Sequence, residues 1–417
     1  MSDFQSTSRK PVVMRIGMIG IGVGGSEIMP AIDAMDTVVL VAGADVVPET
    51  LTRFKERYPE SRTYLSAKEL CEDPDVDAVW VASPNRFHAE HAILAANAGK
   101  HVVVEKPMAI SLSEAAAMIE AAERNNVKLL AGHTRAFTLP IRAMHKIIKS
   151  GRYGNLQALN IWAYSDWMLR PRTPDELDLK QGGGIPYRQG PHQVDTVRLL
   201  GGGMLRSVRA QVGAWMPERK IPGYYSAFLE FENGVPATIV HNGYGYFVGG
   251  EMVTWGRDKS IYEVEERVRL RRTLKNGQRN EASEKQDIRI GGKRSQDYFA
   301  PAQDPWMPED MGMAIVSLND ADLRQSEFGL YIHDGSGKRN IDLIQPGTSG
   351  ALQRRAELEE LYDSVYNGAV LWHDGRWGMA TLEACLAIME SARLRCEIKL
   401  NHQVPVPAGY NDDLVVD

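Results

Sequence analysis

The sequence predicts an α/β fold, with a doubly wound parallel sheet first and an α+β region with a mainly antiparallel sheet after it. Three observations lead to this prediction. Short apolar runs alternate with helical patterns along the first third of the chain, a glycine-rich loop follows the first apolar run, and strand patterns dominate from Ser207 onward. Strands that alternate with helices form parallel sheets, whereas successive strands joined by tight turns form antiparallel sheets.

The elements of the first region follow from the spacing of their apolar residues. Apolar runs of strand length occupy residues 12–19, 38–44, 78–82, 101–104 and 127–131. Helical spacing occupies residues 26–35, a stretch that starts at Pro48, and residues 88–98 and 111–126. Ser111 and Glu114 have the spacing of a capping box, and Gly99 fits the end of a helix.

The character of the chain changes after Gly132, and we place a domain boundary there, with a first domain of residues 1–134 and a second of residues 135–417. Helical spacing then occupies residues 139–150, 189–200, 356–367 and 379–395, and strand patterns occupy residues 156–166, 207–215, 225–232 and 236–243. Asn233-Gly234 predicts a hairpin between the last two strands. Asn276-Gly277 predicts another hairpin, in a charged stretch (267–294) that we expect to be solvated.

Composition excludes several classes of protein. The 417 residues are 43% hydrophobic and 24% charged, with a formal net charge of −6, so neither a nucleic-acid partner nor a membrane partner is expected. No apolar run approaches the roughly 20 residues that span a bilayer. The polar start, Met1 to Lys10, lacks the apolar core of a secretory signal, and we expect a cytoplasmic protein. The cysteines Cys71, Cys385 and Cys396 fit buried thiols rather than disulfides or a metal site.

A glycine-rich loop between the first strand and the first helix predicts a dinucleotide site. Its glycines fit G-x-G-x-x-G, which allows a tight turn and a close approach of the backbone to a pyrophosphate at the start of a helix. This is the signature of a Rossmann domain. The loop consists of Gly20, Ile21, Gly22, Val23, Gly24 and Gly25.

Asp45 ends the second predicted strand, 20 residues after Gly25. An acid at this position accepts hydrogen bonds from the adenosine ribose and repels a 2′-phosphate, so the predicted cofactor is NAD rather than NADP. The alternative is a turn aspartate beside a glycine loop that binds no nucleotide.

Further motifs resemble the Gfo/Idh/MocA oxidoreductases. The resemblance rests on Ser83-Pro84-Asn85 with His88, on Glu105-Lys106-Pro107, and on residues 134–137 and 182–192. It implies a second domain built on a large open sheet, through which the chain would form a homodimer or homotetramer. It also implies that the NAD site includes Ser83, Asn85, His88, Glu105 and Lys106.

The resemblance places Lys106 and His192 at the catalytic centre. An amine beside the nicotinamide can accept the carbinol proton or stabilise the alkoxide that forms as hydride leaves. Relatives have an aspartate four residues before the histidine, but this chain has Arg188 there. A cation in that position predicts a small anionic substrate, and we expect no metal.

Several arginines fall in segments that the resemblance assigns to the substrate site. They are candidate anchors for an anionic substrate, because guanidinium binds carboxylates bidentately. Alternatively, these arginines pair with Asp175, Glu176 and Asp178. Trp162, Trp167 and Tyr187 could flank a flat ring. The predicted substrate-binding residues are Arg135, Trp167, Arg170, Arg172, Arg188 and His192.

Three functions remain open from the sequence. The arginine loop after Ser165-Asp166-Trp167 resembles family members that oxidise the cis-4,5-dihydrodiol of phthalate to 4,5-dihydroxyphthalate. A second possibility is a sugar or inositol-type polyol dehydrogenase. A third, of another class, is a catalytically inactive dinucleotide-sensing regulator, against which the intact Lys106 and His192 argue.

Overall fold

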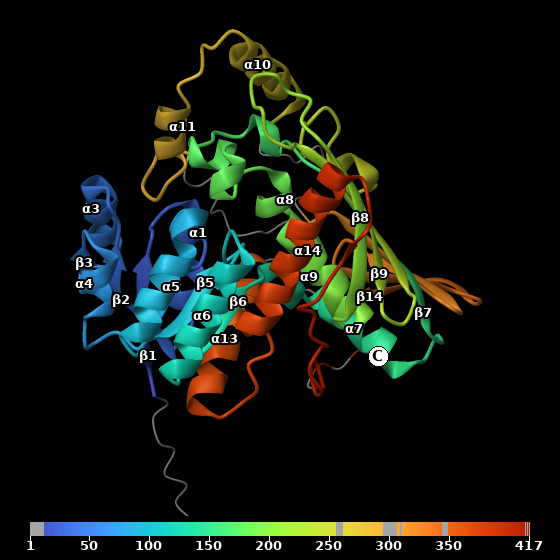
Figure 1. Cartoon of the computed structure of the whole chain (residues 1–417), viewed down its shortest axis with the longest axis horizontal. Coiled ribbons are helices and arrows are strands. Elements are labelled where there is room, and N and C mark those ends of the chain that lie inside the picture. Colours follow the sequence, from blue (N-terminus) through green and yellow to red (C-terminus); the bar gives the residue numbers. More distant parts are fainter. Residues whose placement is uncertain are drawn as a thin grey trace, which may run out of the picture.

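The structure is a computed structural model that describes residues 12–255, 262–294, 307–308, 311–343, 349–412, 414 and 416. Within these residues two sheets organise the chain (Figure 1). The first has six parallel strands in the order β3-β2-β1-β4-β5-β6, and the second has nine strands in the order β14-β13-β12-β11-β7-β10-β9-β8-β15. The predicted α/β fold class, with its parallel first sheet and mainly antiparallel second sheet, is therefore confirmed.

The first sheet is buried on both faces by helices. One buried cluster of apolar residues includes Val79 and Val102, and a second includes Ile16 and Trp80. The strands are β1 (Met14–Ile19), β2 (Val38–Ala44), β3 (Arg62–Tyr64), β4 (Ala78–Val81), β5 (His101–Glu105) and β6 (Leu129–Gly132). The helices are α1 (Val23–Ser26), α2 (Met29–Asp33), α3 (Pro48–Arg57), α4 (Ala67–Cys71), α5 (His88–Asn97) and α6 (Leu112–Arg124).

One predicted helix of this region was wrong in its extent. Residues 26–35 do not form a single helix, because α1 ends at Ser26 and α2 starts at Met29. Pro30 explains the break: proline lacks an N–H and is tolerated in the first turn of a helix but not in its interior.

The second sheet is covered on one face by helices α7, α9 and α14. Its strands β7 and β10 pair in parallel, and the other neighbouring strands pair antiparallel. The predicted hairpin at Asn233-Gly234 joins β9 to β10, with Gly234 at φ +82°. The strands are β7 (Leu156–Tyr164), β8 (Leu205–Gly213), β9 (Tyr224–Phe231), β10 (Pro236–Asn242), β11 (Met313–Leu318), β12 (Ala321–Gln325), β13 (Gly329–Asp334), β14 (Gly337–Asp342) and β15 (Ile398–Lys399). The helices are α7 (Leu139–Ser150), α8 (Ile185–Arg188), α9 (Gly190–Gly201) and α14 (Gly375–Leu394).

The charged stretch at residues 267–294 corrects two predictions. It contains α10 (Val264–Lys275) and α11 (Glu281–Asp287) rather than a hairpin. Asn276-Gly277 ends α10, with Gly277 at φ +62°, because the left-handed conformation that suits a hairpin also suits the residue after a helix. The stretch is not simply solvated, since Arg267 is 3% exposed.

Helix α13 (Ser349–Tyr366) returns the chain to the first sheet. Its Leu358 and Leu361 are fully buried in the same cluster as Ile16 and Trp80. The layer of helices over the Rossmann sheet thus includes a segment that lies more than two hundred residues after the predicted domain boundary. The position of that boundary stays a prediction.

The cysteine prediction was partly wrong. All three cysteines are free, and Cys71 and Cys385 are buried, but Cys396 is exposed. Among the residues that the structure describes, no helix is both long enough and apolar enough to span a membrane.

Candidate functional site

The glycine loop has a shape that only glycine allows at two positions. Gly20 has φ +88°, and a Cβ atom there would lie 2.7 Å from the backbone of Ala82 and Ser83. A Cβ atom on Gly25 would collide with the carbonyl oxygen of Gly20. Gly22, by contrast, faces open space, as does Gly24 between Val23 and Gly25. The loop therefore packs closely against the sheet and stays uncovered on the side where a pyrophosphate would lie, so it fits NAD.

Asp45 is joined to this loop directly. Its Oδ2 accepts a hydrogen bond from the backbone N–H of Ile21 at 2.9 Å, and its Oδ1 accepts one from the backbone N–H of Val47 at 2.9 Å. Each carboxylate oxygen keeps a further lone pair that a ribose hydroxyl can use. Asp45 thus has a structural role in addition to the predicted contact with the cofactor.

His88 is buried between two loops at the edge of the first sheet. Its Nε2 lies 2.7 Å from the carbonyl oxygen of Ser83, and its Nδ1 lies 2.8 Å from that of Pro107. Burial lowers the pKa of His88, against the two carbonyl oxygens, which raise it. A neutral ring donates to one of these oxygens only, so His88 lies between the loop after β4 and the loop that follows Lys106 with a single hydrogen bond to one of them.

Asn85 connects the two domains. Its Nδ2 donates to the carbonyl oxygen of Gly182 at 2.9 Å, and its Oδ1 accepts from Nη1 of Arg188 at 3.2 Å. The Ser83 hydroxyl, a few residues earlier, lies 2.9 Å from Nδ1 of His91. The loop after β4 is thus fixed against the glycine triplet of the second domain.

The two charged residues of the Glu105-Lys106-Pro107 motif have different partners. Nζ of Lys106 donates to the carbonyl oxygen of Arg188 at 2.9 Å. Oε1 of Glu105 accepts from Nη1 of Arg354 in α13 at 2.7 Å. Arg354 also pairs with Glu27 and Glu357, and although burial alone would lower its pKa, these acids raise it. This ion pair between α13 and Glu105 was not predicted, because no local pattern near Glu105 indicates a partner so far along the chain.

His192 is a neutral base beside Lys106. It lies on α9 and is 8% exposed, and its buried Nδ1 has no hydrogen-bond partner among the described residues. Burial holds the pKa of His192 well below its usual value, and the nearby charges of Lys106 and Arg135 lower that pKa further. An uncharged imidazole in this position can accept a proton.

His133 is a further buried histidine of the site that contains His192 and Lys106, and it was not among the residues predicted from the sequence. It directly follows β6 and is 2% exposed, and neither ring nitrogen has a partner within the described part of the chain. Burial lowers its pKa, and the charge of Asp195 opposes that shift. The available signal was its position at the carboxyl end of a parallel strand, where open α/β sheets bind their ligands.

The arginines of the predicted substrate site gather around one buried acid, Glu176. Its Oε1 lies 3.0 Å from Nη1 of Arg172 and 3.2 Å from Nη2 of Arg188, and its Oε2 lies 2.8 Å from Nζ of Lys285 in α11. Burial alone would raise the pKa of Glu176, yet the three cations hold it well below its usual value. The alternative that the arginines pair with nearby acids holds for Glu176.

Arg170 and Trp167 lie around this cluster, whereas Arg135 acts on His192. Nε of Arg170 pairs with Oδ1 of Asp166 at 2.9 Å. Trp167 is 1% exposed, and the guanidinium of Arg172 lies 3.7 Å from the centroid of its ring, a cation–π contact that orients Arg172. Trp162 is in a different place: it lies on β7 and is 41% exposed, and it occupies the face of the second sheet opposite the buried Ile161. The prediction that Trp162 flanks the substrate ring was wrong.

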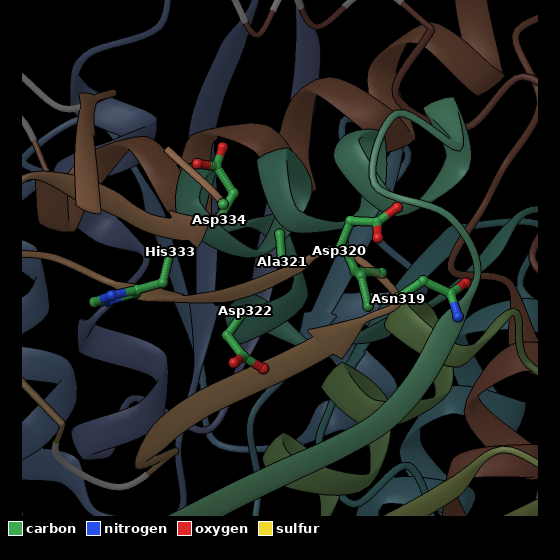
Figure 2. A pocket seen from close by; sticks show the side chains of 8 residues that line it. Asn319, Asp320, Ala321, Asp322, His333 and Asp334 are labelled. Carbon is green, nitrogen blue, oxygen red and sulfur yellow. The ribbon is translucent and has the colours of Figure 1, made fainter. Parts of the chain in front are cut away.

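A separate hollow lies at the far end of the second sheet, between the β11–β12 turn and the end of β13 (Figure 2). The carboxylates that line it point in different directions: Asp322 accepts a hydrogen bond from Ser317, and Asp334 pairs with Arg339. Across the described ranges, no group of three or more His, Cys, Asp or Glu side chains is arranged to hold a metal ion. This hollow does not belong to the site around Lys106.

Comparison with known families assigns both domains. Residues 14–133 match the oxidoreductase family with an NAD-binding Rossmann fold (GFO_IDH_MocA), and residues 141–255 match the GFO/IDH/MocA C-terminal domain. A similar curated protein is the 1-carboxy-3-chloro-3,4-dihydroxycyclohexa-1,5-diene dehydrogenase of Comamonas testosteroni. It is 32% identical over 385 residues, which cover 91% of this chain and 95% of that protein.

Solved structures agree with this assignment. A protein from Bordetella bronchiseptica RB50 superposes with a TM-score of 0.84 at 32% identity, covering 93% of this chain and 100% of that one. A levoglucosan dehydrogenase in complex with NADH and levoglucosan superposes with a TM-score of 0.72 at 18% identity, covering 93% of this chain and 99% of that one. At this lower identity the second likeness concerns the fold alone.

Proposed function

We propose that this chain, which belongs to the Gfo/Idh/MocA family of NAD-binding oxidoreductases, oxidises one carbinol of an anionic cyclic cis-diol. The chain is a dehydrogenase of the class that acts on diols and polyols. The observation that carries the finer proposal is the buried cation cluster of Arg172, Arg188 and Lys285, joined to Lys106 through the backbone of Arg188.

The substrate that fits best is phthalate cis-4,5-dihydrodiol, which would yield 4,5-dihydroxyphthalate. The Comamonas testosteroni relative is named for a ring that carries a carboxylate and a vicinal diol, and this supports an anionic cyclic diol here. A dicarboxylate gives the buried cations a use that a neutral polyol does not. Oxidation of one carbinol leaves a hydroxyketone that tautomerises to the aromatic catechol, which favours the forward direction.

Lys106 and His192 divide the proton chemistry between them. NAD supplies the hydride acceptor when it is bound. Lys106 lies where a cationic amine can stabilise the alkoxide, and the neutral His192 beside it can accept the hydroxyl proton. This division does not require the aspartate that relatives carry at the position of Arg188.

The cofactor side of the site supports NAD. Asp45 presents its carboxylate at the end of β2, and an acid there disfavours the 2′-phosphate of NADP. The glycine loop from Gly20 to Gly25, held to Asp45 through Ile21, would receive the pyrophosphate.

The open face of the second sheet is the surface we propose for a homodimer or homotetramer. Trp162 is 41% exposed and Phe228 is 48% exposed, and the strand register places both on the face that the helices do not cover. Trp162→Glu together with Phe228→Glu should lower the mass measured by light scattering, whereas an unchanged mass in the double variant would contradict this surface.

A substrate panel tests the proposed reaction. The purified protein is mixed with NAD and, separately, with the phthalate cis-4,5-dihydrodiol, the same diol ring without carboxylates, and myo-inositol, and NADH absorbance is recorded. Turnover of the dicarboxylate alone supports the proposal. Turnover of myo-inositol instead would identify a polyol dehydrogenase. Binding of NAD without turnover of any compound would favour the dinucleotide-sensing regulator.

A further inference from the structure

Residues 262–294, which hold α10 and α11, extend from the substrate loop of the second domain to α3 of the first. On one side Nη1 of Arg279 donates to the carbonyl oxygen of Leu169 at 2.6 Å. On the other side Nη1 of Arg53 in α3 donates to the carbonyl oxygen of Ile290 at 3.4 Å, and Ile290 packs against the core of the first domain. In Figure 1 these helices lie above α1 and α8. The segment therefore bridges the arginine loop of the second domain and α3 of the first.

Helix α11 is attached to the substrate loop by charged contacts as well. Oε2 of Glu281 accepts hydrogen bonds from the backbone N–H of Arg172 at 2.8 Å and from Nη2 of Arg219 at 2.5 Å. Nζ of Lys285 contacts Glu176 at 2.8 Å and the carbonyl oxygen of Pro171 at 3.4 Å. One helix thus fixes the backbone of the arginine loop and also supplies a cation to the cluster around Glu176.

The cluster carries more positive than negative charge. Among the described residues, three cations, Arg172, Arg188 and Lys285, surround the carboxylate of Glu176, which leaves an excess of two positive charges there. The next charged groups outward that the structure describes do not remove this excess, because each arginine pairs with an acid of its own: Arg170 with Asp166, Arg219 with Glu281, and Arg279 with Glu284.

Burial makes that excess costly. The side chains of Arg172 and Lys285 are only 8% and 16% exposed. Burial lowers the pKa of Arg172 to about 10 and that of Lys285 to about 8. Buried cations without a matching anion are destabilised, and a ligand that supplies the missing negative charge is bound correspondingly well.

The cluster is connected to the catalytic lysine through Arg188. Arg188 is its most exposed cation, at 26%, and its carbonyl oxygen accepts the hydrogen bond from Lys106. A substrate whose carbinol lies at Lys106 would therefore meet Arg188 first, and Arg188 shares Glu176 with Arg172 and Lys285.

We propose that Lys285 of α11 is a substrate-binding residue that selects a dicarboxylated diol over a monocarboxylated one, an inference that rests on the proposed function. Two carboxylates neutralise the excess of two positive charges around Glu176, whereas one carboxylate leaves a buried charge unmatched. Lys285 is the cation that the described part of α10 and α11 brings to Glu176, so this segment contributes one of the charges that the substrate would match.

Kinetics with a matched pair of substrates test this role. KM and kcat are measured with NAD for the dicarboxylated cis-dihydrodiol and for the same ring with one carboxylate, using wild type, Lys285→Met, Lys285→Arg and Lys293→Met. Lys293 is exposed and lies in the same segment, so it controls for a general loss of surface charge. We expect Lys285→Met to raise the KM for the dicarboxylate by about tenfold or more, with a smaller change in kcat and in the KM for the monocarboxylate.

The conservative variant separates binding from folding. Lys285→Arg should recover most of the preference for the dicarboxylate, and Lys293→Met should behave as wild type. Calorimetric binding of phthalate and of benzoate to the NADH-loaded protein repeats the comparison without turnover. If Lys285→Met keeps the wild-type ratio of the two affinities, the role of Lys285 is refuted while the proposed function stands. If the wild type neither turns over nor binds either carboxylated compound, the proposed function and the role of Lys285 are both refuted.

Discussion

Nζ of Lys106 donates a hydrogen bond to the carbonyl oxygen of Arg188 at 2.9 Å, across 82 positions of sequence and between the two domains. The same arginine directs its guanidinium to Glu176 and Asn85. One residue therefore holds the amine of Lys106 with its backbone and contributes to the cation cluster around Glu176 with its side chain. On the proposed function, a substrate carboxylate and the reacting carbinol would lie on either side of Arg188.

Loss of the amine at position 106 should affect chemistry far more than cofactor binding. We expect Lys106→Met to lower kcat by about 10³-fold, because a cation near the developing alkoxide is removed, while the affinity for NAD stays close to that of wild type. Stopped-flow NADH formation and fluorescence titration of NADH measure the two quantities. A variant with near wild-type kcat would show that Lys106 is not catalytic.

Loss of the carboxylate at position 45 should weaken both the loop and the cofactor site. Asp45→Ala removes the acceptor for the backbone N–H groups of Ile21 and Val47, so we expect a lower affinity for NAD, a lower Tm and less discrimination against NADP. Asp36→Ala, at an exposed position near the start of β2, is the matched control. An unchanged ratio of NAD to NADP affinity would remove Asp45 from the ribose site.

The first domain was predictable because its signals are local. Buried strands such as β4 and β5 are continuous apolar runs. Ser111 caps its helix as expected, with Oγ accepting from the backbone N–H of Glu114 at 3.3 Å, but the Glu114 carboxylate accepts from the backbone N–H of Ile110 rather than that of Ser111, so only half of the predicted capping box forms. The position of the glycine loop was also predictable, because the backbone conformations that require glycine are limits on single residues.

The substrate cluster was harder to predict because it depends on contacts between distant segments. Arg172 lies four residues from Glu176, but Lys285 lies 109 residues away from it, and nothing in its neighbourhood marks it as buried. The end of α10 was also mistaken for a hairpin, because the backbone conformation that Asn276-Gly277 prefers fits a hairpin and a helix end equally. The spacing of apolar residues alone does not distinguish these two structures.

The ion pair between α13 and Glu105 should contribute strongly to stability. Arg354→Met would remove the cation that pairs with the buried Glu105 and Glu357 carboxylates, and we expect the free energy of unfolding to fall by about 3 kcal/mol. Arg355→Met is the control on the same helix, because Arg355 pairs with Glu359 at an exposed position and should cost less than about 1 kcal/mol. Equal losses in the two variants, measured by urea unfolding, would contradict a special role for Arg354.

The affinity for a dicarboxylated substrate should fall as the pH rises through about 8. Burial lowers the pKa of Lys285 to about 8, against the opposing charge of Glu176 and reinforced by Arg172 and Arg188, so its ammonium group is present below that pH and lost above it. Only the charged form attracts a carboxylate, and the bound anion in turn raises the pKa, so the decline should appear in kcat/KM more than in kcat. Lys285→Arg should extend the plateau to higher pH because guanidinium stays charged, and Lys285→Met should remove this limb of the profile. A wild-type limb near pH 8 that persists unchanged in Lys285→Met would assign the titration to another group.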